Sequence, residues 1–435
     1  MTAFKTWCLI MSITYVRPKQ TRHVHVVGAG LTGTVAAYLL ANAGFTVTVH
    51  ERLRYAGGLC ADIACSEVDG KIVLGSGEDS VRVPLHGPHI FHTNDERVYD
   101  LMCRLADWDT QYHIVHNKTE AGVITMPVNL TGKAQIVSYM RKNGITLTED
   151  PVQHFAYREY SRKQWGRPLE EIPPHILNRV QSRDDYSVKF FTDKYVMRPR
   201  LGYRRMFDNI LSHVNIGLVK GQAVELKDFK DDPVIWTGYL SEEWLDLSGM
   251  HIKQPKYVHL HTIVQWEPLD CTHVLNSNLR EDAWTRRTNC CRYDSSHKVG
   301  TLRRVPYLYE YPAAVPPFHG DWCFGDFMPG WILPDKHDIH LLTSFHLINS
   351  LRDLYPNAVF AGRWGTNSYL NMDDCVKSAI EAVNELLGKQ HPGLRLCLDN
   401  VLPARGSSYD AQKINGYALM IDSEEIERDY IMYKS

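Results

Sequence analysis

The chain has 435 residues, of which 44% are hydrophobic and 23% are charged, and its formal net charge at pH 7 is −2. This composition is typical of a globular enzyme of about three domains. The near-zero net charge argues against a general nucleic-acid-binding or membrane-binding surface.

The first twenty residues are interpreted as an appendage to the first predicted strand, with Met11 as an alternative start to Met1. The apolar run at 7–16 is too short to cross a bilayer, and no small-residue cleavage pattern follows it. The ten cysteines include no Cys-x-x-Cys pair, which favours free thiols in a reducing compartment over a disulfide framework. We therefore expect a cytoplasmic protein.

Residues 23–58 have the pattern of a dinucleotide-binding βαβ unit. An apolar strand leads into Gly28-x-Gly30-x-x-Gly33, a helix follows, and a second strand ends at Glu51. Gly28 permits the tight turn, Gly30 lets the backbone approach a pyrophosphate, and Gly33 lets the helix pack on the strand. The helix N-terminus offers N–H groups to the phosphates, and Glu51 is placed to bind the ribose hydroxyls.

The residues after Glu51 bear on which dinucleotide is bound. Arg52 follows directly, and Gly57 and Gly58 come shortly after. This stretch resembles the one that approaches the FAD phosphates in flavoproteins with two dinucleotide-binding domains. The resemblance implies FAD, rather than NAD, as the cofactor.

The rest of the chain contains both predicted helices and predicted strands. Helical stretches are predicted at 96–106 and 132–143, and alternating apolar residues predict strands at 256–266 and 307–311. A strand at 357–363 is followed by a helix at 373–387, for which Gly388 is the expected stop.

These elements predict an α/β fold whose Rossmann-type FAD-binding domain is built from discontinuous segments. We assign 21–94, 205–250 and 346–392 to that domain, 95–180 to a helical domain, and 181–204 with 251–345 to an antiparallel β-sheet domain. Residues 1–20 form the N-terminal appendage and 393–435 a C-terminal extension, in which 422–430 is a candidate short helix.

Several blocks of sequence, in chain order, resemble the UDP-galactopyranose mutase family. The most specific are Gly-Pro-His-Ile-Phe-His-Thr-Asn at 87–94 and Tyr-Ser-Arg-Lys-Gln-Trp-Gly-Arg at 160–167. Further similar blocks lie at 126–130, 178–183, 191–195, 236–238, 360–363 and 369–372. The resemblance extends from about residue 23 to residue 388, which is too long and too ordered for chance.

The resemblance implies a mutase that interconverts the pyranose and furanose forms of a nucleotide sugar, either UDP-galactopyranose or a relative. In this family, N5 of reduced FAD attacks the anomeric carbon and displaces the nucleoside diphosphate, so the cofactor is the nucleophile. The reaction has no net redox change but requires the reduced flavin. It therefore implies an external reductant, NAD(P)H or a reductase. The oligomeric state is open, and a homodimer is one option.

The resemblance also implies roles for individual residues. Arg183 and Arg303 correspond to two arginines that clamp the diphosphate, a task suited to the guanidinium fork. Arg304 is an alternative to Arg303 if the alignment slips by one residue, and for any arginine a solvated surface charge is the competing interpretation. The expected substrate-binding residues are Tyr157, Tyr160, Trp165, Arg183, Arg303, Tyr369 and Asn371, and the expected catalytic residues are Arg183, Arg303, Tyr160, Trp165, Tyr369 and His89. The expected cofactor-binding residues are Gly28, Gly30, Thr32, Gly33, Glu51, Arg52, Gly57, Gly58, His89, Arg363 and Met372.

Two competing interpretations concern single side chains. Core packing competes with substrate contact for Tyr160 and Trp165. A metal site competes with a flavin contact for His89, because His86, His89 and His92 are spaced three apart. The intervening Gly-Pro breaks any helix that would align the three histidines, so no metal is expected.

The chain also departs from the family pattern, mainly where the family contacts the sugar. A Pro-Tyr-Tyr-Pro stretch has no clear counterpart, with 326–331 occupying its region. Asn371 stands where the family has an acid, and Tyr293 where it has an asparagine. A different nucleotide sugar therefore remains open. So do an FAD-dependent oxidoreductase of the amine-oxidase-like fold and a binding protein with a vestigial flavin site.

Overall fold

We analysed a computed structural model of the chain, which describes residues 23–75, 80–177, 180–240, 257–294, 302–312, 328–332, 339–390, 394–396, 417–421 and 431–434. The expected appendage at 1–20 and the candidate helix at 422–430 lie outside these residues.

The first of the two large sheets is parallel and has five strands, in the order β11-β2-β1-β12-β18. Its strands come from three distant parts of the chain, with bounds β1 (His23–Val27), β2 (Thr46–Glu51), β11 (Ile216–Lys220), β12 (Val234–Trp236) and β18 (Ala358–Phe360). The Rossmann-type α/β architecture predicted from the sequence is confirmed. Its discontinuous assembly follows from these pairings.

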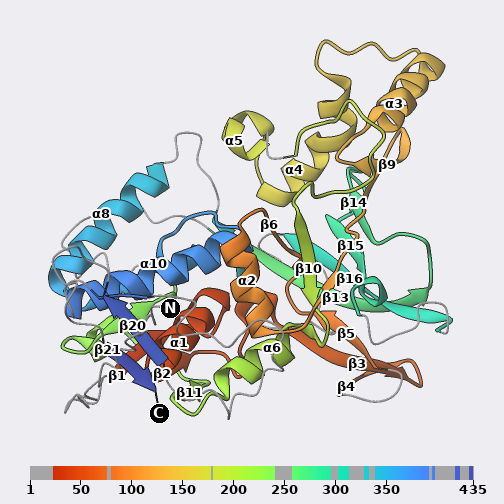
Figure 1. Cartoon of the computed structure of the whole chain (residues 1–435). Coiled ribbons are helices and arrows are strands. Elements are labelled where there is room, and N and C mark those ends of the chain that lie inside the picture. Colours follow the sequence, from red (N-terminus) through yellow and green to blue (C-terminus); the bar gives the residue numbers. More distant parts are fainter. Residues whose placement is uncertain are drawn as a thin grey trace, which may run out of the picture.

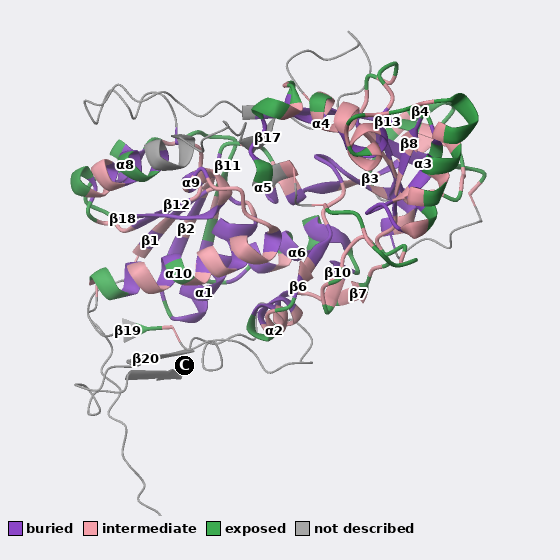
Figure 2. Cartoon of the chain, turned by 90° about the horizontal axis from the view of Figure 1, so that it is seen from above, coloured by how far each residue is buried: buried purple, intermediate pink, exposed green. Residues whose placement is uncertain are grey.

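Helices cover both faces of this sheet, as Figure 2 shows with the sheet between α8 and the α1–α10 pair. α1 (Leu31–Asn42), α6 (Gly202–Leu211), α2 (Glu96–Leu105) and α10 (Met372–Gln390) bury one face together with Val24, Val26, Val47 and Val49. α8 (Ile339–Leu354) and the short turn η4 (Leu226–Phe229) pack on the other face against β12 and β18. All twelve residues of α1 are buried, which explains its unbroken apolar and small-residue sequence.

The second large sheet has seven strands in the order β17-β13-β16-β15-β14-β8-β9. Its bounds are β8 (Val115–Thr119), β9 (Gly122–Met126), β13 (Tyr257–Pro268), β14 (Val274–Ser277), β15 (Arg286–Asn289), β16 (Arg304–Pro312) and β17 (Met328–Ile332). The strands expected at 256–266 and 307–311 are β13 and β16, which pair in antiparallel register.

The helices at the far end of the molecule in Figure 1 are α3 (Leu130–Asn143), the π-helical turn η2 (Gln153–Tyr157), α4 (Arg158–Trp165) and α5 (Pro174–Leu177). α3 ends at Gly144, which adopts the left-handed conformation usual after a helix. Together with η2, α3 packs on β8, β9 and β14.

Three small sheets complete the fold. The first contains β3 (Asp62–Val68), β4 (Lys71–Leu74) and β5 (Val81–Pro84), and the second β6 (Phe91–Thr93), β7 (Trp108–Thr110) and β10 (Tyr195–Pro199). The third lies in the C-terminal extension and contains β19 (Leu394–Arg395), β20 (Tyr417–Ile421) and β21 (Ile431–Lys434). No helix in the described parts of the chain is both long and apolar enough to span a membrane.

The structure differs from the sequence-based elements in three places. The stretch 95–180 is not wholly helical, because β8 and β9 leave it to join the seven-stranded sheet. Strand β10, expected in the large β domain, pairs with β6 and β7 instead. Gly388 does not end α10, which continues to Gln390; the amino group of Lys389 bonds the carbonyl of Ala358 and pairs with Glu385, which holds the last turn.

Candidate active site

The turn between β1 and α1 packs too closely for any side chain at two of its glycines. Gly28 has φ +101°, and a Cβ there would lie 2.3 Å from Oγ1 of Thr237. A Cβ on Gly33 would lie 1.9 Å from the carbonyl oxygen of Gly28, so helix and strand touch backbone to backbone. A Cβ on Gly30 would meet only the Cα of Gly58, at 4.0 Å. The turn is therefore closely packed at Gly28 and Gly33, whereas it has free space beside Gly30.

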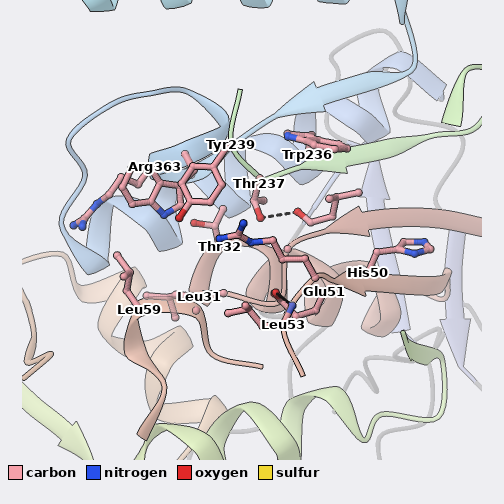
Figure 3. A pocket seen from close by; sticks show the side chains of 18 of the residues that line it. Leu31, Thr32, His50, Glu51, Leu53, Leu59, Trp236, Thr237, Tyr239 and Arg363 are labelled. Atoms are coloured by element: carbon pink, nitrogen blue, oxygen red, sulfur yellow. Dashed lines mark hydrogen bonds between the residues drawn. The ribbon is translucent and has the colours of Figure 1, made fainter. Parts of the chain in front are cut away.

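A cavity of about 450 Å³ lies in front of this turn. It is lined by the glycine turn, by residues 50–53 after β2, by 222–225 after β11, by 236–239 after β12 and by 362–364 after β18. These segments follow the carboxyl ends of parallel strands, which is where open α/β sheets bind their ligands. Figure 3 shows the labelled side chains around this cavity.

Glu51 stands at one end of this cavity, which we call the dinucleotide cavity. Its carboxylate accepts hydrogen bonds from the backbone N–H groups of Ala29, at 2.8 Å, and Leu53, at 2.9 Å. Burial raises the pKa of Glu51, although these two N–H groups oppose the shift. The backbone therefore fixes the orientation of the carboxylate at the place where a ribose would lie.

Arg363, His89 and Met372 line the dinucleotide cavity where it adjoins a second cavity. Nε of Arg363 donates to the carbonyl oxygen of Leu370 at 3.1 Å, and its guanidinium lies over the ring of Tyr369. Figure 3 places Arg363 far from Glu51 and His50. Arg363 therefore borders the dinucleotide cavity, but at the end away from the ribose position.

His89 is held in one protonation state. Burial lowers its pKa to about 3, so the ring is neutral. Nδ1 lies 2.8 Å from the carbonyl oxygen of Gly87. Because a carbonyl only accepts, Nδ1 carries the proton and Nε2 is left as an acceptor.

The residues of the dinucleotide cavity fit an adenine dinucleotide. The N-terminus of α1 has neither a side-chain cap nor an acidic residue in its first turn, so its N–H groups are available to an anion. The open front of Gly30 and the fixed Glu51 complete the arrangement.

A second cavity of about 310 Å³ adjoins the first and shares with it Leu59, His89, Arg363 and Met372. One face of the η2–α4 segment lines it through Tyr157, Tyr160, Ser161, Gln164 and Trp165. Residues spaced three and four apart share a helix face, which accounts for this set. We call it the substrate cavity.

The π-helical turn η2 shifts the register of this face and leaves carbonyl groups without helical partners. Two buried asparagines satisfy them, Asn117 of β8 and Asn278, which directly follows β14. The amide of Asn117 donates to the carbonyl of Ala156 at 2.5 Å, and that of Asn278 donates to the carbonyl of Phe155 at 2.8 Å. The sheet therefore fixes the helix that carries Tyr157 and Tyr160.

Arg286 on β15 provides the guanidinium of the substrate cavity. Nη2 donates to the hydroxyl of Tyr160 at 3.1 Å, and Nη1 lies 3.4 Å from the carboxylate of Glu310, the residue opposite on β16. Burial lowers the pKa of Arg286, but Glu310 and Tyr160 more than offset this, so the net shift is upward. A fixed positive charge therefore lines the substrate cavity, bonded to Tyr160 of α4.

Glu310 is buried beside Arg286, with 1% of its surface exposed. Burial raises its pKa and Arg286 lowers it. Gly87, with φ +96°, packs on this carboxylate, since a Cβ there would lie 3.0 Å from it. Glu310 therefore helps to fix the position of Arg286 in the substrate cavity.

Aromatic rings form part of the wall of the substrate cavity. His92 stacks on Phe191 with ring centres 4.0 Å apart, and His113 stacks on the same ring at 5.2 Å. Phe190 and Phe191 both line the cavity. Such a wall presents an aromatic surface against which a flat ring of a ligand can pack.

The structure brings together most of the residues singled out from the sequence. The dinucleotide cavity contains Gly28, Gly30, Thr32, Glu51, Arg52, Gly57, Gly58, His89, Arg363 and Met372, and the substrate cavity contains Tyr157, Tyr160, Trp165, Tyr369 and Asn371. Gly33 lies behind the turn, where it packs on Gly28.

Three predicted positions lie elsewhere. Arg303 is exposed just before β16 and lines neither cavity, and its neighbour Arg304 pairs with Glu67. Arg183 lines neither cavity and donates to the backbone carbonyls of Lys189 and Phe190. Tyr293 is buried and its hydroxyl contacts His113, at 3.0 Å.

The histidines spaced three apart have separate partners. His86 contacts the hydroxyl of Tyr55, His89 the carbonyl of Gly87, and His92 the carboxylate of Asp193. Among the residues that the structure describes, no three His, Cys, Asp or Glu side chains are placed to hold a metal ion.

Sequence reasoning missed Arg286, Glu310, His113 and the Phe190–Phe191 pair. The available signals were two arginines within a strand-like run and an acid inside the aromatic stretch 307–311. Charged residues in strands that are otherwise buried usually have a partner or a function.

Comparisons with known proteins identify the relatives of this chain. The family model of UDP-galactopyranose mutase (GLF) matches residues 155–369, and that of the NAD(P)-binding Rossmann-like domain matches residues 26–105. The chain is 25% identical to a probable UDP-galactopyranose mutase of Klebsiella pneumoniae over 84% of this chain and 95% of that protein. It is also 25% identical to the dTDP-fucopyranose mutase of Escherichia coli, over 82% and 96%.

Two solved structures share the fold. A crystal structure of reduced UDP-galactopyranose mutase matches with a TM-score of 0.60 at 15% identity, covering 85% of this chain and 94% of that one. Cyclohexylamine oxidase from Brevibacterium oxydans matches with a TM-score of 0.51 at 12% identity, covering 85% and 100%. At these identities the likeness concerns the fold alone.

Proposed function

The chain belongs to the UDP-galactopyranose mutase family as a divergent member, and on that premise we propose that it is an isomerase that interconverts the pyranose and furanose forms of a nucleotide sugar. The observation that carries the proposal is the junction of the two cavities. They meet at Leu59, His89, Arg363 and Met372, with the guanidinium of Arg286 in the second cavity. A dinucleotide in the first cavity would present its reactive ring to a ligand in the second.

FAD is the dinucleotide that the proposal places in the first cavity. Glu51 would hold the ribose and the N-terminus of α1 the pyrophosphate. When bound and reduced, FAD supplies the nucleophile of the reaction, N5, for attack at the anomeric carbon of the sugar. An external reductant, either NAD(P)H or a reductase, is part of the proposal.

The chain's own residues perform the remaining tasks. Arg286 and the hydroxyl of Tyr160 receive the diphosphate, whose negative charge increases as it leaves the sugar. We assign to Arg286 the role that the sequence suggested for Arg303, because Arg286 lines the substrate cavity and Arg303 does not. A direct contact of Arg183 with the diphosphate stays a prediction.

His89 and Asn371 border the sugar position. Nε2 of neutral His89 can accept a hydrogen bond from a sugar hydroxyl, while Nδ1 stays bonded to Gly87. Asn371 offers an amide in place of the family's acid. The aromatic wall of Phe190, Phe191 and His113 stacks on the nucleobase.

Turnover under anaerobic conditions tests the proposed function. The dithionite-reduced protein is incubated with UDP-galactopyranose, dTDP-fucopyranose and a panel of other nucleotide hexoses, and products are separated by chromatography. We expect one substrate to give an isomeric peak with the reduced protein and none with the oxidised protein. Isomerisation that is independent of reduction, or oxygen-consuming oxidation of an amine with no isomerisation, would contradict the proposal.

An oxidoreductase of the amine-oxidase-like fold is the alternative, and the substrate cavity does not favour it. Such an enzyme needs no diphosphate clamp. Placing a guanidinium and a carboxylate in a buried cavity is costly unless a ligand or each other's charge compensates. Arg286 and Glu310 compensate each other's charge. The argument for an anionic substrate is therefore that the guanidinium lines the cavity beside the hydroxyl of Tyr160, to which it is bonded.

A further inference from the structure

Lys163 belongs to the most specific block of the sequence, yet it lines neither cavity. Its neighbours Gln164 and Trp165 both face the substrate cavity. The ammonium group of Lys163 instead donates to three backbone carbonyl oxygens, those of Leu279 at 3.0 Å, Asp282 at 3.1 Å and Trp284 at 3.0 Å. All three belong to one loop.

That loop, residues 278–285, joins β14 to β15 and leads directly into Arg286. Two further hydrogen bonds connect it and Arg286 to α4. The backbone N–H of Tyr160 donates to Oδ1 of Asn278 at 2.8 Å, and Arg286 donates to the hydroxyl of Tyr160 at 3.1 Å. Lys163 supplies the attachment in the middle of the loop, between these two.

We propose that Lys163 is a positioning residue for Arg286: it holds the 278–285 loop against α4 and thereby fixes where the guanidinium meets the diphosphate of a substrate. The identity of that ligand rests on the proposed function. The attachment of the loop rests only on the contacts of this chain.

The geometry requires a charged lysine. An ammonium group has three N–H donors for its three carbonyl acceptors, whereas a neutral amine has two donors and a lone pair that would face a carbonyl oxygen. Burial lowers the pKa of Lys163 to about 8, against the opposing effect of nearby acids. The charged groups around it are Glu159 and Arg162 on α4 and Glu281 and Asp282 in the loop, with Lys118 of β8 paired to Asp282.

The loop should therefore loosen as pH rises through about 8. Below that pH the ammonium is present and all three bonds are made. Above it the proton is lost, because deprotonation relieves the cost of a buried charge. Arginine at position 163 would keep its charge throughout this range.

Lys118 offers a matched control, because it contacts the same loop in a different way. Its ammonium group binds the side chain of Asp282 at 3.0 Å and is 40% exposed. Exposed ion pairs contribute little to stability. Removing Lys118 therefore removes a lysine that contacts the same loop, without removing the attachment of the loop backbone to Lys163.

Hydrogen exchange in the full-length, FAD-loaded protein tests the attachment without any substrate. We expect Lys163→Met to raise the exchange rates of amides in 278–286 at least tenfold over wild type, and Lys118→Met to change them less than threefold. Lys163→Arg should restore part of the protection. Equal exchange in Lys163→Met and wild type overturns the proposal.

The affinity for UDP, measured by titration between pH 6.5 and 9.5, tests the effect on Arg286. We expect the Kd of wild type to rise about tenfold from pH 7 to pH 9, as titration of one group near pH 8 requires. Lys163→Met should bind at least tenfold more weakly at pH 7, and Lys163→Arg should lose the rise in Kd above pH 8. An unchanged Kd in Lys163→Met, or the same alkaline rise in Lys163→Arg, overturns the proposal.

The two measurements separate this proposal from the proposed function. If wild type fails to bind UDP at any pH, the substrate class is wrong, and the exchange rates alone decide whether Lys163 holds the loop. If UDP binds to wild type but Lys163→Met changes neither the amide exchange rates nor the Kd for UDP, the proposed function stands and the role of Lys163 is refuted.

Discussion

Replacing Arg286 with methionine is expected to lower kcat/KM for the nucleotide sugar by about 100-fold, equivalent to about 3 kcal/mol of transition-state stabilisation. The guanidinium lies in the substrate cavity, bonded to Tyr160 and paired with Glu310. It is the group that would meet the departing diphosphate. Steady-state kinetics of the reduced enzyme measure the effect.

Two companion variants separate the loss of the clamp from damage to the fold. Arg286→Met leaves Glu310 buried and unpaired, which destabilises the protein by itself. The double variant with Glu310→Gln removes that charge, so we expect it to regain stability but not activity. Arg303→Met should retain kcat/KM within about twofold, as most exposed substitutions do, because Arg303 is exposed outside both cavities. Loss of activity in Arg303→Met with a normal Arg286→Met would reverse the assignment.

Gly33→Ala is expected to yield protein with less than a tenth of the wild-type flavin content and a free energy of unfolding lower by about 1–3 kcal/mol. The added Cβ would lie 1.9 Å from the carbonyl oxygen of Gly28. A backbone carbonyl cannot rotate out of the way as the end of a flexible side chain can. The helix would have to move off the strand and carry its N-terminus away from the pyrophosphate. Absorbance near 450 nm per protein and chemical denaturation provide the readouts.

Gly388→Ala is the control for this substitution. Gly388 lies within α10, and a Cβ there would meet no atom within 4 Å. Alanine in a helix is favoured over glycine by about 0.5–1 kcal/mol, so this variant should keep its flavin and gain slightly in stability. Full flavin content in Gly33→Ala would mean that the turn does not hold the cofactor as described.

The β1–turn–α1–β2 unit could be predicted because its signals are local. Gly28, Gly30 and Gly33 are fixed by one turn, and Glu51 closes the next strand. The strands β13 and β16 were similarly visible from their alternation. Each of these elements lies within about a dozen consecutive residues, where periodicity is informative.

Arg286 could not be found this way, because its role depends on pairing between strands. Its partner Glu310 lies opposite in the β15–β16 register, and Tyr160 comes from a helix more than a hundred residues earlier. The resemblance to known mutases pointed to Arg303, which is exposed and lies just before β16. Sequence spacing says nothing about which arginine faces a cavity.

Helix details also depended on distant residues. The π-helical turn η2 exists where Asn117 and Asn278 are available to satisfy its carbonyls, and neither is near it in sequence. From the sequence, the residues of β8 and β9 were assigned to a helical domain, because the strands with which they pair in the seven-stranded sheet are distant in sequence. Tertiary contacts decided both cases over local propensity.

A crystal structure of the oxidised protein with UDP-galactopyranose, or with whichever nucleotide sugar proves to be the substrate, tests the central claim most directly. The account predicts FAD in the dinucleotide cavity, the diphosphate bound to Arg286 and Tyr160, and the anomeric carbon facing the flavin beside His89. A nucleotide sugar bound elsewhere, for instance with its diphosphate on Arg303 and the substrate cavity empty, would contradict it.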